Sequence, residues 1–143
     1  MPEIGGMVMA SIRKDIEIDA PAAAVWDAVR DVGQIHTRFV PGFVTDTKLE
    51  EGARIVTFAN GLVVRELILD LDEDRRRLAY AVSGSEMMSH HSASFEVVPE
   101  GEGRCRLVWI ADFLPHEAAE PVGGMMTEGA AIMQAALGRK GGG

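Results

Sequence analysis

Apolar and polar residues alternate along most of the chain between residues 11 and 113, which predicts a protein built mainly from β-strands. The clearest stretch is 52–95, where Asn60-Gly61 separates two apolar runs and is a strong hairpin signal. Polar turns follow at 72–75 and at 83–85. Four consecutive strands joined by such turns predict an antiparallel meander.

Helical patterns lie on both sides of these strands. Pro21 suits the start of a helix, and Gly33 suits its end. Near the C-terminus, apolar residues recur at spacings of three and four. The expected elements are a strand at 11–19, a helix at 22–32, a helical turn at 34–39, six strands at 43–49, 54–59, 62–71, 77–82, 90–98 and 104–113, and a helix at 121–139. Seven antiparallel strands with two helical regions indicate an α+β fold.

Alternation also predicts which side chains face the core. On the last strand Leu107, Trp109, Ala111 and Phe113 share one apolar side, and Cys105 shares it as an inert core residue. On the two preceding strands the inward set includes Tyr80 and His91, whereas His90 faces outward. The strand at 62–71 is ambiguous because both of its faces carry Val or Leu. Either Val64, Glu66 and Ile68 face inward, or Val63, Arg65 and Leu67 do.

Three segments resemble the SRPBCC superfamily, also called the START or Bet v 1-like superfamily. They are Ile18-Asp-Ala-Pro-Ala-Ala-Ala-Val-Trp, the run from Glu66 to Tyr80, and Val108-Trp109 on the last strand. Small bacterial members are often labelled polyketide cyclase/dehydrase-like. The resemblance implies a helix-grip fold, in which a seven-stranded antiparallel sheet wraps around a long C-terminal helix, with a cavity between them. It covers a single domain at 10–139, flanked by flexible termini at 1–9 and 140–143.

Residues 52–54, 60–62 and 65–76 also resemble strands of the plant abscisic acid receptors. By this resemblance, Glu66 matches a pocket glutamate and His91 occupies the position of a pocket tyrosine. His36 falls near the position of the lysine that binds the ligand carboxylate. A histidine in place of that lysine weakens the inference that the ligand is a carboxylate.

The candidate ligand-binding residues combine the inward face with this resemblance. They are His36, Arg54, Asn60, Glu66, Tyr80, His91, Trp109, Phe113, Met125, Met126 and Met133. Glu66 and His91 are also candidate catalytic residues. Each has a structural alternative: Glu66 can pair with Arg54 or Arg65, and His91 can be a core histidine. The methionines pack the core or adapt to an irregular ligand.

Composition narrows the choice of partners. The net charge of −8 argues against nucleic acid or an anionic membrane surface. No apolar run approaches the ~20 residues that span a bilayer. The start of the chain lacks a signal-peptide pattern and Cys105 is the single cysteine, so we expect a cytoplasmic protein. We also expect a monomer or a homodimer. No metal or cofactor is expected, since the chain lacks HExxH, GxGxxG and GxxxxGK[ST] motifs.

Three functions remain open. The first is binding of an apolar small molecule, lipid-, polyketide- or aromatic-like, and it is favoured because no pair of groups resembles a committed catalytic set. The second is a cyclase, dehydratase or aldol-type enzyme with Glu66 or His91 as general acid or base on a polyketide-like substrate. The third is an interaction protein whose loops at Asn60 and at 83–89 close over a ligand and present a partner surface.

Overall fold

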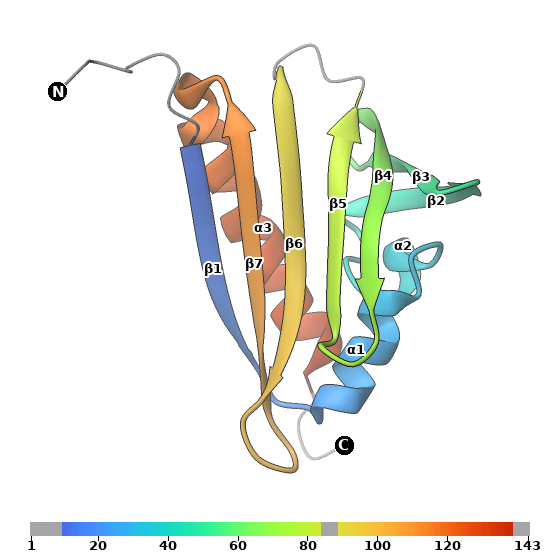
Figure 1. Cartoon of the computed structure of the whole chain (residues 1–143), viewed down its shortest axis with the longest axis vertical. Coiled ribbons are helices and arrows are strands. Elements are labelled where there is room, and N and C mark those ends of the chain that lie inside the picture. Colours follow the sequence, from blue (N-terminus) through green and yellow to red (C-terminus); the bar gives the residue numbers. More distant parts are fainter. Residues whose placement is uncertain (1–9, 84–88, 139–143) are drawn as a thin grey trace, which may run out of the picture.

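Seven antiparallel strands form one sheet, and a long helix lies against one of its faces (Figure 1). In this computed structural model the order across the sheet is β1-β7-β6-β5-β4-β3-β2, so β1 and β2 are its edges. The strands are β1 (Ala10–Ile18), β2 (Val44–Glu50), β3 (Ala53–Phe58), β4 (Val63–Asp72), β5 (Arg77–Ser83), β6 (His90–Pro99) and β7 (Cys105–Leu114). The predicted α+β fold and its seven-stranded antiparallel sheet are confirmed.

The structure describes residues 10–83 and 89–138. The predicted flexible termini at 1–9 and 140–143 lie outside these ranges. Most of the loop between β5 and β6, residues 84–88, also lies outside them.

The helices are α1 (Ala22–Arg30), α2 (Ile35–Arg38), the short 3₁₀ helix η2 (His116–Ala118) and α3 (Ala119–Leu137). α3 begins two residues before the predicted start, which places Pro121 in its first turn. Proline is tolerated there because the first N–H groups of a helix have no partner within it.

A cluster of polar contacts ties α1 to the turn between β4 and β5. The indole Nε1 of Trp26 donates to Oε1 of Glu73 at 2.7 Å, and Arg30 binds the same carboxylate at 2.7–3.0 Å. Trp26 is otherwise buried in the core. Because these contacts join residues more than forty positions apart, they hold α1 across the end of the sheet.

The predicted inward faces of β5, β6 and β7 agree with the burial of their side chains. The inner face of the sheet, turned toward α3, carries Leu107, Trp109 and Phe113, which are all buried. Cys105 is buried on the same side, and burial together with the nearby Glu100 carboxylate raises the pKa of its thiol to about 11. A thiol in this environment is protonated and unreactive at neutral pH.

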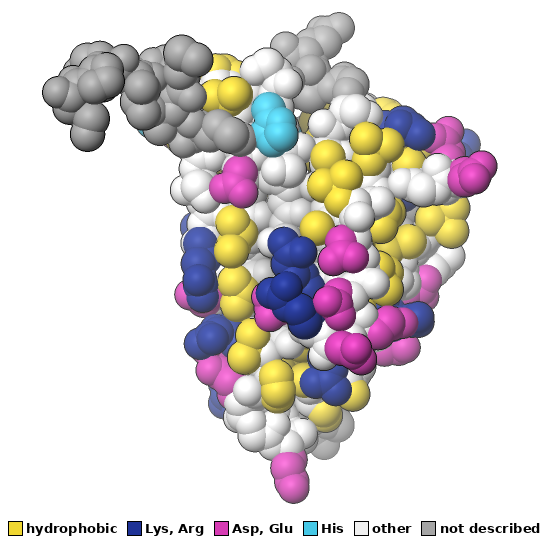
Figure 2. Space-filling view, in the orientation of Figure 1, with side chains coloured by type: hydrophobic (Ala, Val, Ile, Leu, Met, Phe, Trp, Pro, Cys, Tyr) yellow, Lys and Arg dark blue, Asp and Glu magenta, His cyan; other side chains and the backbone are white. Residues whose placement is uncertain are grey.

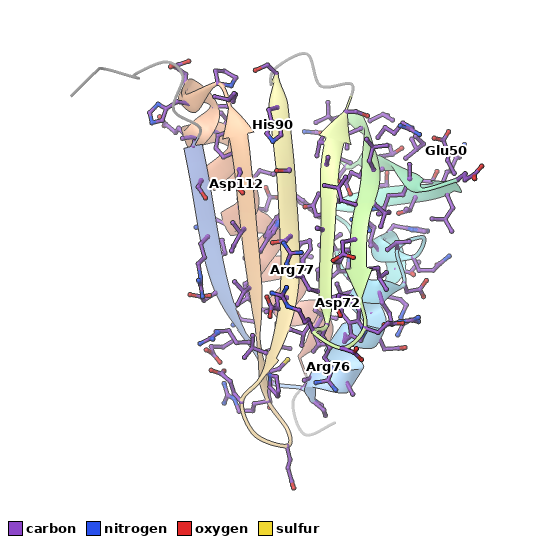
Figure 3. All side chains as sticks on the ribbon, viewed as in Figure 1. Glu50, Asp72, Arg76, Arg77, His90 and Asp112 are labelled. Atoms are coloured by element: carbon purple, nitrogen blue, oxygen red, sulfur yellow. The ribbon has the colours of Figure 1, made fainter. Side chains whose placement is uncertain are left out.

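The outer face of the sheet is polar and exposed. His90, Arg77 and Asp112 lie on it, turned away from α3 (Figure 3). Acidic and basic side chains are interspersed there, with apolar side chains between them (Figure 2). The outer face is therefore an ordinary solvated surface. The strand side chains predicted to bind a ligand lie on the inner face.

A β-bulge explains why the pattern of β4 was ambiguous. Ile68 pairs with Tyr80 and Asp70 pairs with Ala79, so Leu69 is the extra residue, and it is 58% exposed. Before the bulge Glu66 is buried on the inner face, and after it Leu71 packs against the core. One inserted residue reverses the alternation, so strict period two fits neither face of the whole strand.

Two glycines of α3 offer a test of how this helix packs. Gly129 is buried, and a Cβ there would lie 3.3 Å from the Trp109 ring and 3.5 Å from Phe43. A Cβ at Gly124 would meet open space. We expect Gly124→Ala to raise the free energy of unfolding by up to about 1 kcal/mol through helix propensity.

We expect Gly129→Ala to raise the free energy of unfolding by clearly less than Gly124→Ala does, because the new methyl group presses on the Trp109 ring. Urea denaturation of both variants measures the difference. An equal gain in stability in both variants would contradict this expectation, because it would show that the Trp109 ring moves aside at no cost.

Candidate functional site

A cavity of about 590 Å³ lies between α3 and the inner face of the sheet. Side chains from α2, from six of the strands, from their connecting segments and from α3 line it. Its polar or charged lining residues are Arg54, Asn60, Glu66, Tyr80 and His91. The remaining lining residues are Ile35, Phe39, Val40, Phe43, Val44, Val56, Phe58, Leu62, Val63, Val64, Val82, Phe95, Trp109, Ala111, Pro121, Val122, Met125, Met126 and Met133.

Most of the residues predicted to bind a ligand line this cavity. They are Arg54, Asn60, Glu66, Tyr80, His91, Trp109, Met125, Met126 and Met133. The cavity brings together residues that lie up to eighty positions apart in the chain. Their roles toward a ligand remain predictions.

Two of the predicted residues, His36 and Phe113, do not line the cavity. The Nδ1 atom of His36 lies 3.0 Å from the Thr47 hydroxyl, so its ring is engaged with β2. Phe113 is fully buried and packs edge-on against His91, with ring centroids 6.1 Å apart. It therefore packs beside a cavity residue, from the neighbouring strand.

Arg54 and Glu66 form a buried ion pair in the wall. They lie directly opposite each other on β3 and β4, and Nε of Arg54 donates to Oε1 of Glu66 at 2.7 Å. Their side chains are only 3% and 8% exposed. Arg65 points to the other side of β4 and binds Glu50 at 2.8 Å. Of the two partners that the sequence allowed for Glu66, the structure selects Arg54.

Arg54 has two further contacts inside the protein. Its Nη1 donates to the Val32 carbonyl at 3.4 Å, a long bond. Its Cζ lies 5.4 Å from the centroid of the Tyr80 ring, within cation–π range. The guanidinium is therefore held in place by three elements of the fold.

Tyr80, Phe95 and Trp109 form an aromatic layer on the inner face. Phe95 stacks on Trp109 with centroids 5.0 Å apart and on Tyr80 with centroids 6.0 Å apart. The Trp109 indole N–H donates to the Tyr80 hydroxyl at 3.3 Å. Burial, and next the Glu66 charge, raises the pKa of Tyr80, so this phenol stays neutral. The layer presents a rigid, mostly apolar surface to the cavity.

His91 is the least satisfied polar group of the wall. It is 9% exposed, and its buried Nδ1 has no hydrogen-bond partner among the described residues. Burial, and next the neighbouring His90, lowers the pKa of His91. A protonated ring would carry an N–H without an acceptor, so the neutral imidazole is the stable form at neutral pH.

Asn60 lies in the hairpin between β3 and β4. Its Oδ1 accepts a hydrogen bond from the Leu62 N–H at 3.0 Å, and Gly61 has a φ of +91°, which favours glycine. Leu62 is 50% exposed although it lines the cavity, so this hairpin lies at its rim. The second loop of the predicted partner surface falls largely on residues 84–88, outside the described residues.

Reasoning from the sequence missed several aromatic residues of the wall. Phe39 and Phe43 come from the segment between α2 and β2, and Phe58 comes from the end of β3. Phe39 packs edge-on against Phe95, and Phe43 against Phe58. The sequence did contain a hint, since Phe39 and Phe43 lie on either side of Pro41. Without a periodic pattern, however, the sequence does not predict which way such side chains point.

The described part of the chain has neither a cluster of metal-ligating side chains nor a helix suited to span a membrane. Within residues 10–83 and 89–138, no three His, Cys, Asp or Glu side chains gather closely enough to hold a metal ion. In the same ranges, no helix is both long and apolar enough to cross a membrane.

Comparison with known families gives one match, which covers residues 9–140. That family is described as polyketide cyclase/dehydrase and lipid transport. The chain belongs to this family. The resemblance to the START and Bet v 1-like superfamily is thereby confirmed. Comparison with curated proteins finds no match.

Solved structures share the fold. An uncharacterised protein from Bacillus thuringiensis is 18% identical with a TM-score of 0.82, over 90% of this chain and 98% of that one. A protein from Thermobifida fusca is 30% identical with a TM-score of 0.74, over 89% of each chain. Norcoclaurine synthase from Thalictrum flavum, with a transition-state analogue, is 20% identical with a TM-score of 0.68, over 91% of this chain and 95% of that one.

The lowered pKa of His91 predicts a pH dependence of stability. The unfolded chain protonates this ring below about pH 6.5, whereas the folded protein protonates it only at lower pH. The unfolded state thus binds more protons in this window, so stability is full above about pH 6.5 and falls as the pH drops toward the lowered pKa. We expect His91→Gln to reduce this loss.

Urea midpoints measured at several pH values between about 5 and 7.5 test this. His116→Gln is the matched control, because His116 is exposed and lies outside the cavity lining. The expectation is wrong if His91→Gln keeps the full slope of the wild-type protein.

Proposed function

We propose that the protein binds an apolar small molecule with one or two polar groups in the cavity between the sheet and α3. The observation that carries the proposal is the cavity itself, which has a volume of about 590 Å³ and a mainly apolar wall. Ligand sites typically have volumes of ~300–1000 Å³, apolar walls and a few placed polar groups. Here the polar groups gather at Arg54, Glu66, Tyr80 and His91.

The family supports this proposal in general terms. Its description includes lipid transport, and the norcoclaurine synthase relative holds a small molecule, a transition-state analogue. The three methionines of α3 suit a ligand of irregular shape, because their side chains are flexible and polarisable.

Filling the cavity tests the proposal directly. N-phenylnaphthylamine, an uncharged probe whose fluorescence rises in apolar surroundings, is titrated into the protein. Val82 lines the cavity from β5, and we expect Val82→Trp to weaken probe binding by about tenfold or more, because the larger side chain occupies the ligand's volume.

Val98→Trp is the matched control. Val98 precedes the end of β6 and is partly exposed, on the face opposite the buried Val97. This variant should bind the probe as the wild type does. Equal binding by the wild type and Val82→Trp would place the probe elsewhere and contradict the proposal.

A second candidate function is catalysis of a cyclase, dehydratase or aldol-type reaction on a polyketide-like substrate. His91 favours it, because a neutral imidazole in the cavity wall can take up or release a proton. Glu66 is less suited to this role because Arg54 already binds its carboxylate. If the protein is such an enzyme, His91→Gln should lower kcat by about 10²- to 10⁴-fold with little change in probe affinity. Unchanged kcat would remove His91 from the mechanism.

A further inference from the structure

We propose that the cavity selects an uncharged ligand and excludes anions, including carboxylates, of the same shape. This inference rests on the proposed binding function and specifies the chemical class of the ligand. It follows from the balance of charges in the cavity wall.

Of the residues that the structure describes, the charged ones lining the cavity are Arg54 and Glu66. Their side chains form an ion pair at 2.7 Å, so the two charges offset each other. The other titratable lining groups are neutral at pH 7. Burial raises the pKa of the Tyr80 phenol and lowers the pKa of the His91 imidazole. Among the described residues, the wall therefore carries no net charge, and a charged ligand would lie against these residues without a counter-ion.

Arg54 at first suggests a carboxylate site, because guanidinium groups bind carboxylates well. Here that interaction is already made within the protein, by Glu66. A ligand carboxylate would have to displace Glu66 or lie beside it. Two negative charges at such a short distance repel each other strongly in an apolar wall. The N–H groups of Arg54 that remain suit a neutral carbonyl or hydroxyl oxygen.

The surroundings of the cavity reinforce this preference. An adjoining hollow of about 340 Å³ shares five lining residues with the cavity, namely Phe43, Phe58, Asn60, Leu62 and Met125. Its one charged lining residue in the described chain is Glu128, which is acidic. The chain also carries a net charge of −8. Both features disfavour the approach of an anion.

Two probes with one skeleton test the proposal. N-phenylnaphthylamine is uncharged, and anilinonaphthalenesulfonate carries a sulfonate on the same ring system. We expect the wild-type protein to bind the uncharged probe at least about tenfold more tightly than the sulfonated one. Only the binding that is lost in Val82→Trp is counted, because that part takes place in the cavity.

Removing one charge of the pair should change this preference. Glu66→Gln keeps the shape and leaves Arg54 as an unpaired cation in the wall, so the ratio of the two dissociation constants should shift toward the anion by about tenfold or more. Glu50→Gln is the matched control. Glu50 is the last residue of β2 (Figure 3) and the partner of Arg65. Its side chain is about half exposed and lies outside the cavity lining, so this variant should leave the ratio unchanged.

A double variant covers the case in which Glu66→Gln does not fold. Arg54→Met with Glu66→Leu removes both charges, a replacement that buried ion pairs often tolerate. The cavity stays without net charge, so the double variant should keep the preference for the uncharged probe.

The outcomes separate the two proposals. Binding of neither probe in the cavity would overturn the proposed binding function. Equal binding of both probes by the wild-type cavity would overturn the charge selection and leave the binding function standing. A ratio that shifts equally in Glu66→Gln and Glu50→Gln would also overturn it, because the effect would then come from overall charge.

Discussion

The inner face of the sheet is wider than the single long helix that covers it, and the cavity follows from this mismatch. α3 packs mainly along β1 at one edge and meets β7 where Gly129 lies against Trp109. β3 to β6 continue beyond that contact, and their inward side chains line open volume. Protein interiors are normally packed to high density with few voids. A space of about 590 Å³ is therefore a feature of this architecture and not a packing defect.

An ion pair within such a wall is tolerated only under narrow conditions. Taking Arg54 and Glu66 out of water costs solvation, which their short bond and the Tyr80 ring partly offset. Losing one partner of a buried pair typically costs about 3–5 kcal/mol. The two residues lie opposite each other in the register of β3 and β4, so the same pairing that builds the sheet also neutralises the cavity.

Family membership establishes the fold but leaves the chemistry to the site, since one scaffold can serve unrelated functions. The norcoclaurine synthase relative and this chain share the fold at 20% identity, which carries no residue role across. We therefore infer the chemistry of this chain from its own cavity wall, which holds the Arg54–Glu66 ion pair, a neutral phenol, a neutral imidazole and many apolar side chains. The proposed binding function and the proposed role of His91 in proton transfer both depend on these groups.

The sequence by itself determined the strands and helices, the inward faces of β5 to β7 and the burial of Cys105, because periodicity is a local property of the chain. Only the tertiary structure decided the partner of Glu66, because the choice between Arg54 and Arg65 depends on cross-strand register and on the bulge at Leu69. It also turned His36 toward Thr47 and brought Phe39 and Phe43 into the wall. Segments without periodicity take their direction from what they pack against, and that information lies in other parts of the chain.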